Sequence, residues 1–161
     1  MAEELGGATP LEYPVDQVFP DPSAGSGSPL VDAAKAVAWE FCVGETLSLG
    51  QLEFHRRHAR HPLLRAVWGR LAKDEAAHAR FGWIFMDWAR PLLSSNERDD
   101  VARTTERALR HVDAIDDKVK SLDPSAFVDV GVFGACGREA YLAETRAILE
   151  EKVIARLERW C

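Results

Sequence analysis

Apolar residues recur at helical spacing along most of the chain and predict two long helices in its first half. Residues 31 to about 60 contain no proline and carry one apolar stripe. His61-Pro62 predicts a short break, after which a second stripe continues until Pro91. We expect the two helices to form an antiparallel hairpin, because the break is short. The stripes consist of Val31, Ala34, Ala38, Phe41, Cys42, Leu49 and Leu52, and of Leu64, Val67, Trp68, Leu71, Phe81 and Phe85.

Two further helices are predicted in the second half. Residues 94–97 (Ser-Ser-Asn-Glu) offer several N-cap groups before a third periodic run, which ends at Asp123-Pro124. Residues 125–137 contain glycines and predict a loop with a short helical turn. A fourth helix should follow, and no run alternates as a strand would. Its inward residues are predicted to be Leu142, Leu149, Val153, Leu157 and Trp160, and those of the third helix Val101, Ala108, Val112, Ile115, Val119 and Leu122.

The sequence therefore predicts an all-α antiparallel bundle of about four helices in residues 31–161. Residues 1–30 hold five of the eight prolines and a Gly/Ser run, so we expect them to form an irregular N-terminal arm. A chain of 161 residues with 47% apolar residues is long enough to bury the core of one such domain.

Charge and cysteine content narrow the class of protein. The net charge is -6, with 20 basic and 26 acidic residues, which argues against nucleic-acid binding. No stretch approaches the ~20 apolar residues of a membrane span, and the first ten residues lack the features of a signal peptide. We expect a soluble, cytoplasmic protein. Cys42, Cys136 and Cys161 are odd in number and far apart, so reduced thiols are expected, with Cys42 buried and inert.

Three side chains of metal-ligand type fall on the apolar faces of the first two helices. On a helical wheel at about 100° per residue, Glu45 lies in the middle of the first stripe, and Glu75 and His78 share the second. An ionised carboxylate there is unfavourable unless a partner, a proton or a metal compensates it. Carboxylate and imidazole groups on facing helices suit iron or manganese and make half of a di-metal site. Alternatively, Glu75 and His78 form a hydrogen-bonded pair that braces the core, with Glu45 bonded to a nearby Arg or Trp.

Two segments resemble the ferritin-like proteins of the di-iron carboxylate type. VGETLSLG (residues 43–50) is similar to the second Glu helix of that family, and LAKDEAAHARFGW (residues 71–83) to its second Glu-x-x-His helix. The resemblance covers about residues 31–90 and is most specific in DEAAHARFGW. It implies a ferritin-like bundle in which Glu45, Glu75 and His78 bind iron, or manganese, while Asp74 accepts a hydrogen bond from a ligand histidine and orients its ring. By spacing alone, Asp74 is equally a solvated helix residue.

The chain departs from the family by carrying only half of the ligands. The family's site uses two Glu helices and two Glu-x-x-His motifs, and this sequence has one of each. Two copies related by a two-fold axis would supply four Glu and two His, so we expect a homodimer. Alternatively, the chain is a fragment of a longer protein, it holds a mononuclear site completed by water ligands, or its site has lost function.

The resemblance implies an O2-dependent oxidoreductase that oxidises a small molecule or Fe2+. An iron-binding, ferroxidase-like protein without an organic substrate is one alternative. A helical interaction bundle with a vestigial site is another. No catalytic residue beyond the metal ligands is predicted, and neither is the substrate.

Overall fold

The computed structural model describes residues 28–123, 134 and 137–160. These residues form an all-α bundle with no strand among them, as the periodicity predicts. Residues 1–27 of the predicted arm, most of the predicted loop, Cys136 and Cys161 lie outside the described residues. The elements are α2 (Pro29–Val37), η3 (Ala38–Glu45), α3 (Thr46–His58), α4 (Pro62–Ala89), η4 (Arg90–Leu92), α5 (Ser95–Ser121), α6 (Arg138–Ile148), η7 (Leu149–Ile154) and α7 (Ala155–Trp160). Of these, η3 and η7 are π-helical and η4 is a 3-10 helix.

The elements α2, η3 and α3 form one continuous helical rod, which we call the first rod. It begins at Pro29, two residues before the predicted start, because proline fits the first helical turn, where its missing N–H has no partner to lose. It ends at His58, and the next residue is extended. His61 precedes a proline and is extended too. Its Nδ1 accepts a hydrogen bond from the Leu63 N–H at 3.2 Å and so caps α4.

The predicted boundaries between the second and third helices are confirmed. The helix α4 ends at Ala89, and the chain turns through η4, which contains Pro91. A capping box then begins α5. In it, the Ser94 N–H donates to Glu97 Oε2 at 2.8 Å and the Glu97 N–H donates to Ser94 Oγ at 3.4 Å.

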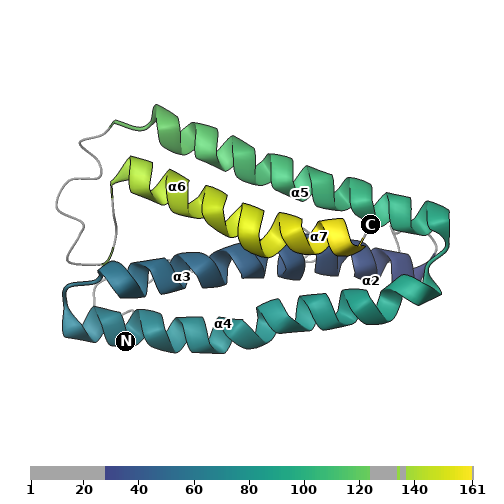
Figure 1. The fold of residues 1–161 in the computed structure, drawn as a ribbon, viewed down its shortest axis with the longest axis horizontal. Helices are drawn as coiled ribbons and strands as arrows, with labels where there is room; N and C mark the ends of the chain where they lie inside the picture. The colour runs from purple at the N-terminus through teal and green to yellow at the C-terminus, as the bar shows by residue number, and fades with distance from the viewer. Residues whose placement is uncertain (1–27, 124–133, 135–136, 161) are drawn as a thin grey trace, which may run out of the picture.

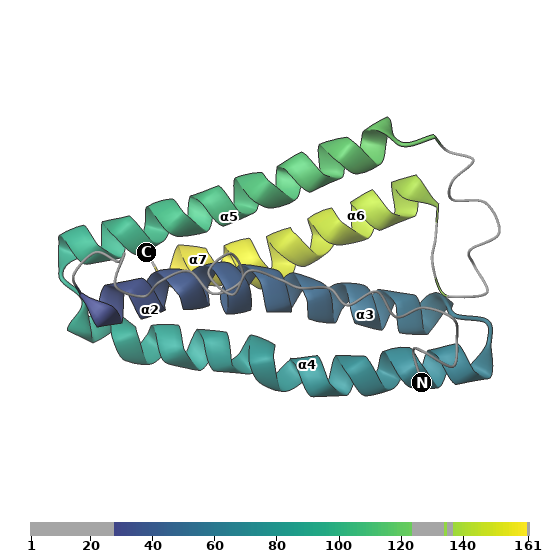
Figure 2. The ribbon, with the colours of Figure 1, turned by 180° about the vertical axis from the view of Figure 1, so that it is seen from behind.

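The first rod lies at the centre of the packing. The helix α4 packs along one side of it, while α5 and the C-terminal rod, α6–η7–α7, pack along the rest. In Figures 1 and 2, α4 forms one edge of the molecule and α5 the opposite edge. One cluster of buried side chains joins α2, η3 and α4, with Val101 of α5, and a second joins η3, α5 and η7. The helix α4 therefore has a neighbour mainly on the side of the first rod.

This arrangement leaves much of α4 uncovered. The periodicity predicts Val67, Leu71 and Phe81 in the core, but these side chains are exposed because no other rod of the described chain packs against them. The residues of α4 that are buried are Ala72, Ala79, Gly82, Trp83, Met86 and Ala89. We call the exposed apolar set of α4 and η4 the α4 stripe; it consists of Leu63, Val67, Leu71, Phe81, Ile84, Trp88 and Leu92. Among the described residues, no helix is both long and apolar enough to cross a membrane.

The third and fourth helices follow the predicted pattern with two exceptions among the described side chains, which do not include that of Trp160. Leu149 and Val153 are buried, and Leu142 and Leu157 are half-buried. Ile115 and Leu122, near the end of α5, are predicted inward but are exposed. In Figure 1, α5 diverges from the first rod toward this end.

Gly134, which lies between α5 and α6 in the sequence, contacts the end of the first rod at His55. Its φ is +86°, which favours glycine, and a Cβ there would clash with the His55 carbonyl oxygen. The Gly134 carbonyl accepts a hydrogen bond from His55 Nδ1 at 3.0 Å. This contact holds the chain close to the end of α3.

Candidate metal centre

Glu45, Glu75 and His78 lie together in the structure. Glu45 is the last residue of η3, while Glu75 and His78 are one turn apart on α4. One ligand-type atom of each side chain lies within 4.8 Å of the other two. His78 Nδ1 is 2.8 Å from Glu75 Oε2 and 3.9 Å from Glu45 Oε1. The spacing therefore identified three side chains that the fold brings to one point.

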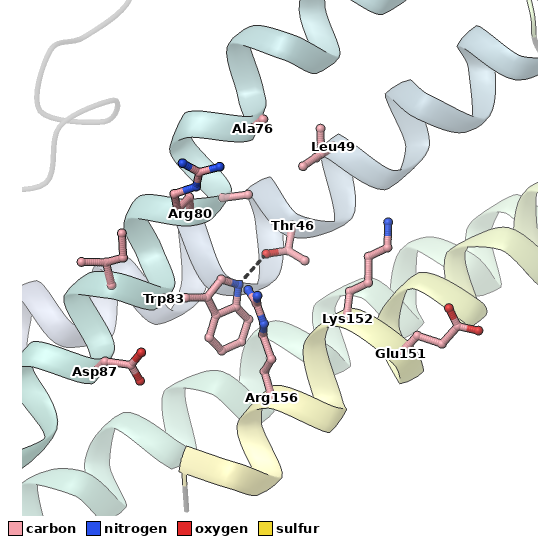
Figure 3. Close-up of a pocket in the computed structure, with 11 residues that line it drawn as sticks. Thr46, Leu49, Ala76, Arg80, Trp83, Asp87, Glu151, Lys152 and Arg156 are labelled. Carbon is pink, nitrogen blue, oxygen red and sulfur yellow. Dashed lines mark hydrogen bonds between the residues drawn. The ribbon is translucent and has the colours of Figure 1, made fainter.

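The π-helical turns of η3 place Glu45, and a hydrogen bond fixes the residue that follows it. Segments of π-helix inside α-helices occur frequently at functional sites. Thr46 Oγ1 donates to the Phe41 carbonyl at 3.4 Å and accepts from Trp83 Nε1 of α4 at 3.1 Å. Figure 3 shows this contact between Trp83 and Thr46. The backbone next to Glu45 is thereby tied to α4.

Close approach of α4 to η3 depends on Gly82. A Cβ on Gly82 would lie 2.6 Å from the Phe41 Cβ and 3.0 Å from the Phe41 carbonyl carbon. Gly82 is one helical turn after His78, so this contact sets how near Glu75 and His78 come to Glu45. The Phe41 ring also packs edge-on to the His78 ring, with their centroids 6.4 Å apart.

The site carries more negative charge than the chain itself compensates. Partial burial raises the pKa of the Glu45 carboxyl, and the adjacent Glu75 carboxyl raises it further, while His78 acts in the opposite direction. A bound cation would relieve this repulsion. Two carboxylates and one imidazole supply oxygen and nitrogen ligands, which fit iron or manganese.

In a single chain the three side chains lie at a rim and not in the interior. The apolar pattern predicts Glu75 and His78 facing inward, but the His78 side chain is 53% exposed. The Glu45 and Glu75 side chains are 29% and 27% exposed. The hydrogen-bonded Glu75–His78 pair of the alternative interpretation is present, yet at this rim it cannot brace a core. The reason is again that α4 has no neighbouring helix on this side.

Asp74 does not orient His78 within one chain. Its carboxylate accepts a hydrogen bond from Arg70 Nε at 3.0 Å, and His78 Nδ1 has Glu75 as its acceptor. Within the chain, Asp74 is therefore a solvated helix residue. A role toward the histidine of a second copy stays a prediction.

The sequence did not indicate a cavity of about 680 Å³ on another side of α4. Figure 3 shows Arg80 and Trp83 reaching it from α4, and Arg156 from the C-terminal rod. The Arg156 guanidinium lies 5.1 Å from the centroid of the Trp83 ring. Glu45, Glu75 and His78 are not among the lining residues. The cavity forms between α4 and the C-terminal rod, and helical periodicity does not encode how far apart two rods lie.

No family model, no curated protein and no solved structure matches this chain. The ferritin-like resemblance of residues 31–90 therefore stays a prediction. A functional proposal must rest on the fold and on the geometry of Glu45, Glu75 and His78.

Proposed function

We propose that this protein is a non-haem metal protein of the di-iron carboxylate type. Glu45, Glu75 and His78 would hold iron, or manganese, and a second copy of the chain would supply the remaining ligands. The observation that carries the proposal is the convergence of the three ligand atoms within 4.8 Å. In the described part of the chain this group has three members, so two copies give the four Glu and two His of a two-metal bundle site.

The reaction class that suits such a site is O2-dependent oxidation. The metal ions would supply the redox chemistry, and the protein would supply the ligands, the polarity and the access route. The glutamates balance the positive charge of the metals, and the Glu75 carboxylate accepts from His78 Nδ1, which leaves Nε2 of that ring available as a ligand atom. The substrate would be a small molecule or Fe2+ itself.

Iron handling without an organic substrate is a second candidate function. Two observations favour it: the cavity in Figure 3 does not include the three ligands, and the His78 ring is open to solvent in one chain. An interaction bundle with a vestigial site, the third interpretation, differs from both by predicting no bound metal.

Metal analysis tests the proposal. Protein purified without chelator and reconstituted anaerobically with Fe2+ or Mn2+ should contain about one metal per chain, by the ligand count of a two-metal dimer. The variant Glu75→Ala/His78→Ala should lose this metal. The matched variant Glu106→Ala/His111→Ala, which removes one Glu and one His from exposed positions of α5, should keep it. Metal content near zero, or unchanged in the first variant, contradicts the proposal.

Oxygen uptake separates the two metal-based functions. Repeated additions of Fe2+ should each consume O2 if the protein oxidises iron as its substrate. A single uptake that stops once about one metal per chain is bound would instead favour an organic substrate.

A further inference from the structure

The α4 stripe is arranged symmetrically along the helix. Its centre lies at the peptide between Ala77 and His78, beside the candidate metal centre. Six of its seven members form three pairs whose first residue precedes Ala77 by as many positions as the second follows His78. The pairs are Leu71 with Ile84 at six positions, Val67 with Trp88 at ten, and Leu63 with Leu92 at fourteen.

Symmetric spacing has a direct meaning for pairing of identical helices. When two copies of a helix pack antiparallel about a two-fold axis, each residue before the axis faces the residue equally far beyond it in the other copy. An axis at Ala77–His78 would place an exposed apolar side chain of one copy opposite an exposed apolar side chain of the other at all six positions. An unrelated partner would not require this symmetry.

We infer that two copies of this chain pair antiparallel along the α4 stripe, with the two-fold axis beside the Ala77–His78 peptide. The inference deepens the proposed function by naming the face and the register of the dimer. It rests on that function in taking the second copy as the source of the missing ligands.

The position of the axis matches the position of the ligands. Glu75 and His78 are centred one residue from the axis, which is ~1.5 Å along a helix, so the two half-sites would be offset by ~3 Å along the paired helices. Metal ions in two-metal sites are about 3.5–4 Å apart. Pairing in this register would therefore bring the two half-sites together, whereas pairing through α5, at the opposite edge of the molecule, would leave them apart.

The stripe has the composition of a surface that is buried on association. Ile84 and Trp88 are 60% and 57% exposed, and large apolar side chains gathered in this way on one exposed helix are typical of interaction sites. The charged residues Arg70 and Asp74 of the same face pair with each other. Phe81 is the member without an apolar counterpart, and it would face Asp74, whose charge Arg70 already balances.

Disulfide trapping tests the register in the full chain. The background carries Cys136→Ser and Cys161→Ser and keeps Cys42, which is buried. Ala77→Cys should link to itself under mild oxidation, because its two copies would lie next to the axis. Leu71→Cys should not link to itself, since its two copies would be about 20 Å apart along the helices.

Mixed variants supply the matched control. Leu71→Cys mixed with Ile84→Cys should give the heterodisulfide, and Leu71→Cys mixed with Trp88→Cys, displaced by one turn on the same stripe, should give at least tenfold less. Equal yields in the two mixtures would overturn the inferred register. A chain that is monomeric in sedimentation at micromolar concentration would overturn the pairing itself.

Two further arms separate this inference from the proposed function. The trapping is repeated with a metal chelator present. If the links form in the inferred register while metal analysis finds no bound metal, the dimer is supported and only the metal centre is contradicted. The chain without residues 1–27 is tested as well. If it dimerises while the full chain is monomeric, the N-terminal segment covers the stripe and the inference is wrong.

Discussion

Glu45 places a carboxyl group where the metal-free protein compensates it poorly. Its pKa is raised by partial burial and by the Glu75 carboxyl, so the folded chain holds the proton more tightly than the unfolded chain does. The stability of the metal-free protein should therefore fall as the pH rises from the ordinary pKa of a glutamate through the raised pKa of Glu45. Above that raised value the full loss is present.

The variant Glu45→Gln should accordingly raise the unfolding free energy of the metal-free protein at neutral pH. The gain should shrink as the pH is lowered toward the ordinary pKa of a glutamate, because the wild-type side chain then becomes neutral too. Urea unfolding at several pH values, with chelator present, measures both effects. Glu106→Gln, at an exposed position of α5, is the control and should show neither.

Asp116 is a second carboxyl group in an unfavourable position. Its side chain is buried, its Oδ1 has no hydrogen-bond partner within the part of the chain that the structure describes, and burial raises its pKa. Nearby Lys120 and Arg146 lower that pKa, which reduces the penalty without removing it.

We expect Asp116→Leu to increase the unfolding free energy at neutral pH by about 1–3 kcal/mol, the cost of leaving a buried polar group unsatisfied. Chemical unfolding of the two proteins gives the difference. In the neighbouring control, Asp117→Leu, an exposed carboxylate is lost, and stability should change by no more than about 0.5 kcal/mol. An equal effect of both substitutions would show that burial of Asp116 is not the cause.

At the scale of single residues, the proximity of Glu45, Glu75 and His78 was predictable and their exposure was not. Residues three apart on one helix must share a face, so the Glu75–His78 pair followed from numbering alone. Exposure of His78 depends on which helices surround α4, and an apolar face has the same pattern whether its own chain or a second copy covers it. The burial of Asp116 could not be predicted either, because it also depends on which helices pack around α5.

At the scale of the elements, the packing of α4 depends on a short contact at Gly82. Gly82 allows α4 to approach the backbone at Phe41 and Cys42, where a Cβ would lie only 3.1 Å from the Cys42 nitrogen. Backbone atoms at that distance cannot move aside as a flexible side chain can. The helix itself would have to shift.

The variant Gly82→Ala should therefore destabilise the protein by about 1–3 kcal/mol through overpacking, although alanine favours a helix. It should also weaken metal binding, because Glu75 and His78 would move away from Glu45. Thermal unfolding and metal titration are the two measurements. Gly69→Ala on the same helix is the control: its Cβ would meet only the flexible Arg56 side chain, at 3.2 Å, and stability should stay equal or rise.

Boundaries of the elements were predictable because they depend on local chemistry. Pro62 and Pro91 interrupt helices through the missing N–H, and Ser94 with Glu97 closes a capping box within four residues. The π-helical segments η3 and η7 were not predicted. A shift of hydrogen bonds from i+4 to i+5 changes the backbone without requiring a different pattern of apolar residues.

On the scale of the whole molecule, the bundle is organised around the first rod. The helix α4 contacts that rod on one side and leaves the α4 stripe exposed, while Glu45, Glu75 and His78 lie at the exposed edge of the contact itself. The chain therefore keeps open surfaces that a metal or a second copy can stabilise. A metal that binds the folded chain and not the unfolded one adds stability by mass action.

Loading the protein with Fe2+ or Mn2+ under anaerobic conditions should raise its unfolding free energy by about 2.7 kcal/mol at a hundredfold excess of metal over the Kd. Calorimetry with and without metal measures this as an increase in Tm. The variant Glu75→Ala/His78→Ala should show no increase. A wild-type Tm that stays unchanged at saturating metal would contradict specific binding to the folded state.

The buried thiol of Cys42 can be used to measure how often the helices around it separate. Its side chain is fully buried in the cluster that joins α2, η3 and α4, and burial raises its pKa to about 12, so little reactive thiolate forms while this cluster stays packed. The rate at which an alkylating reagent modifies Cys42, followed by peptide mass spectrometry, thus reports how often the helices that cover the thiol move apart. Glu45 lies on η3, and Glu75 and His78 lie on α4. A motion that separates these two elements and exposes Cys42 would therefore also separate the three side chains, and the labelling rate would report its frequency.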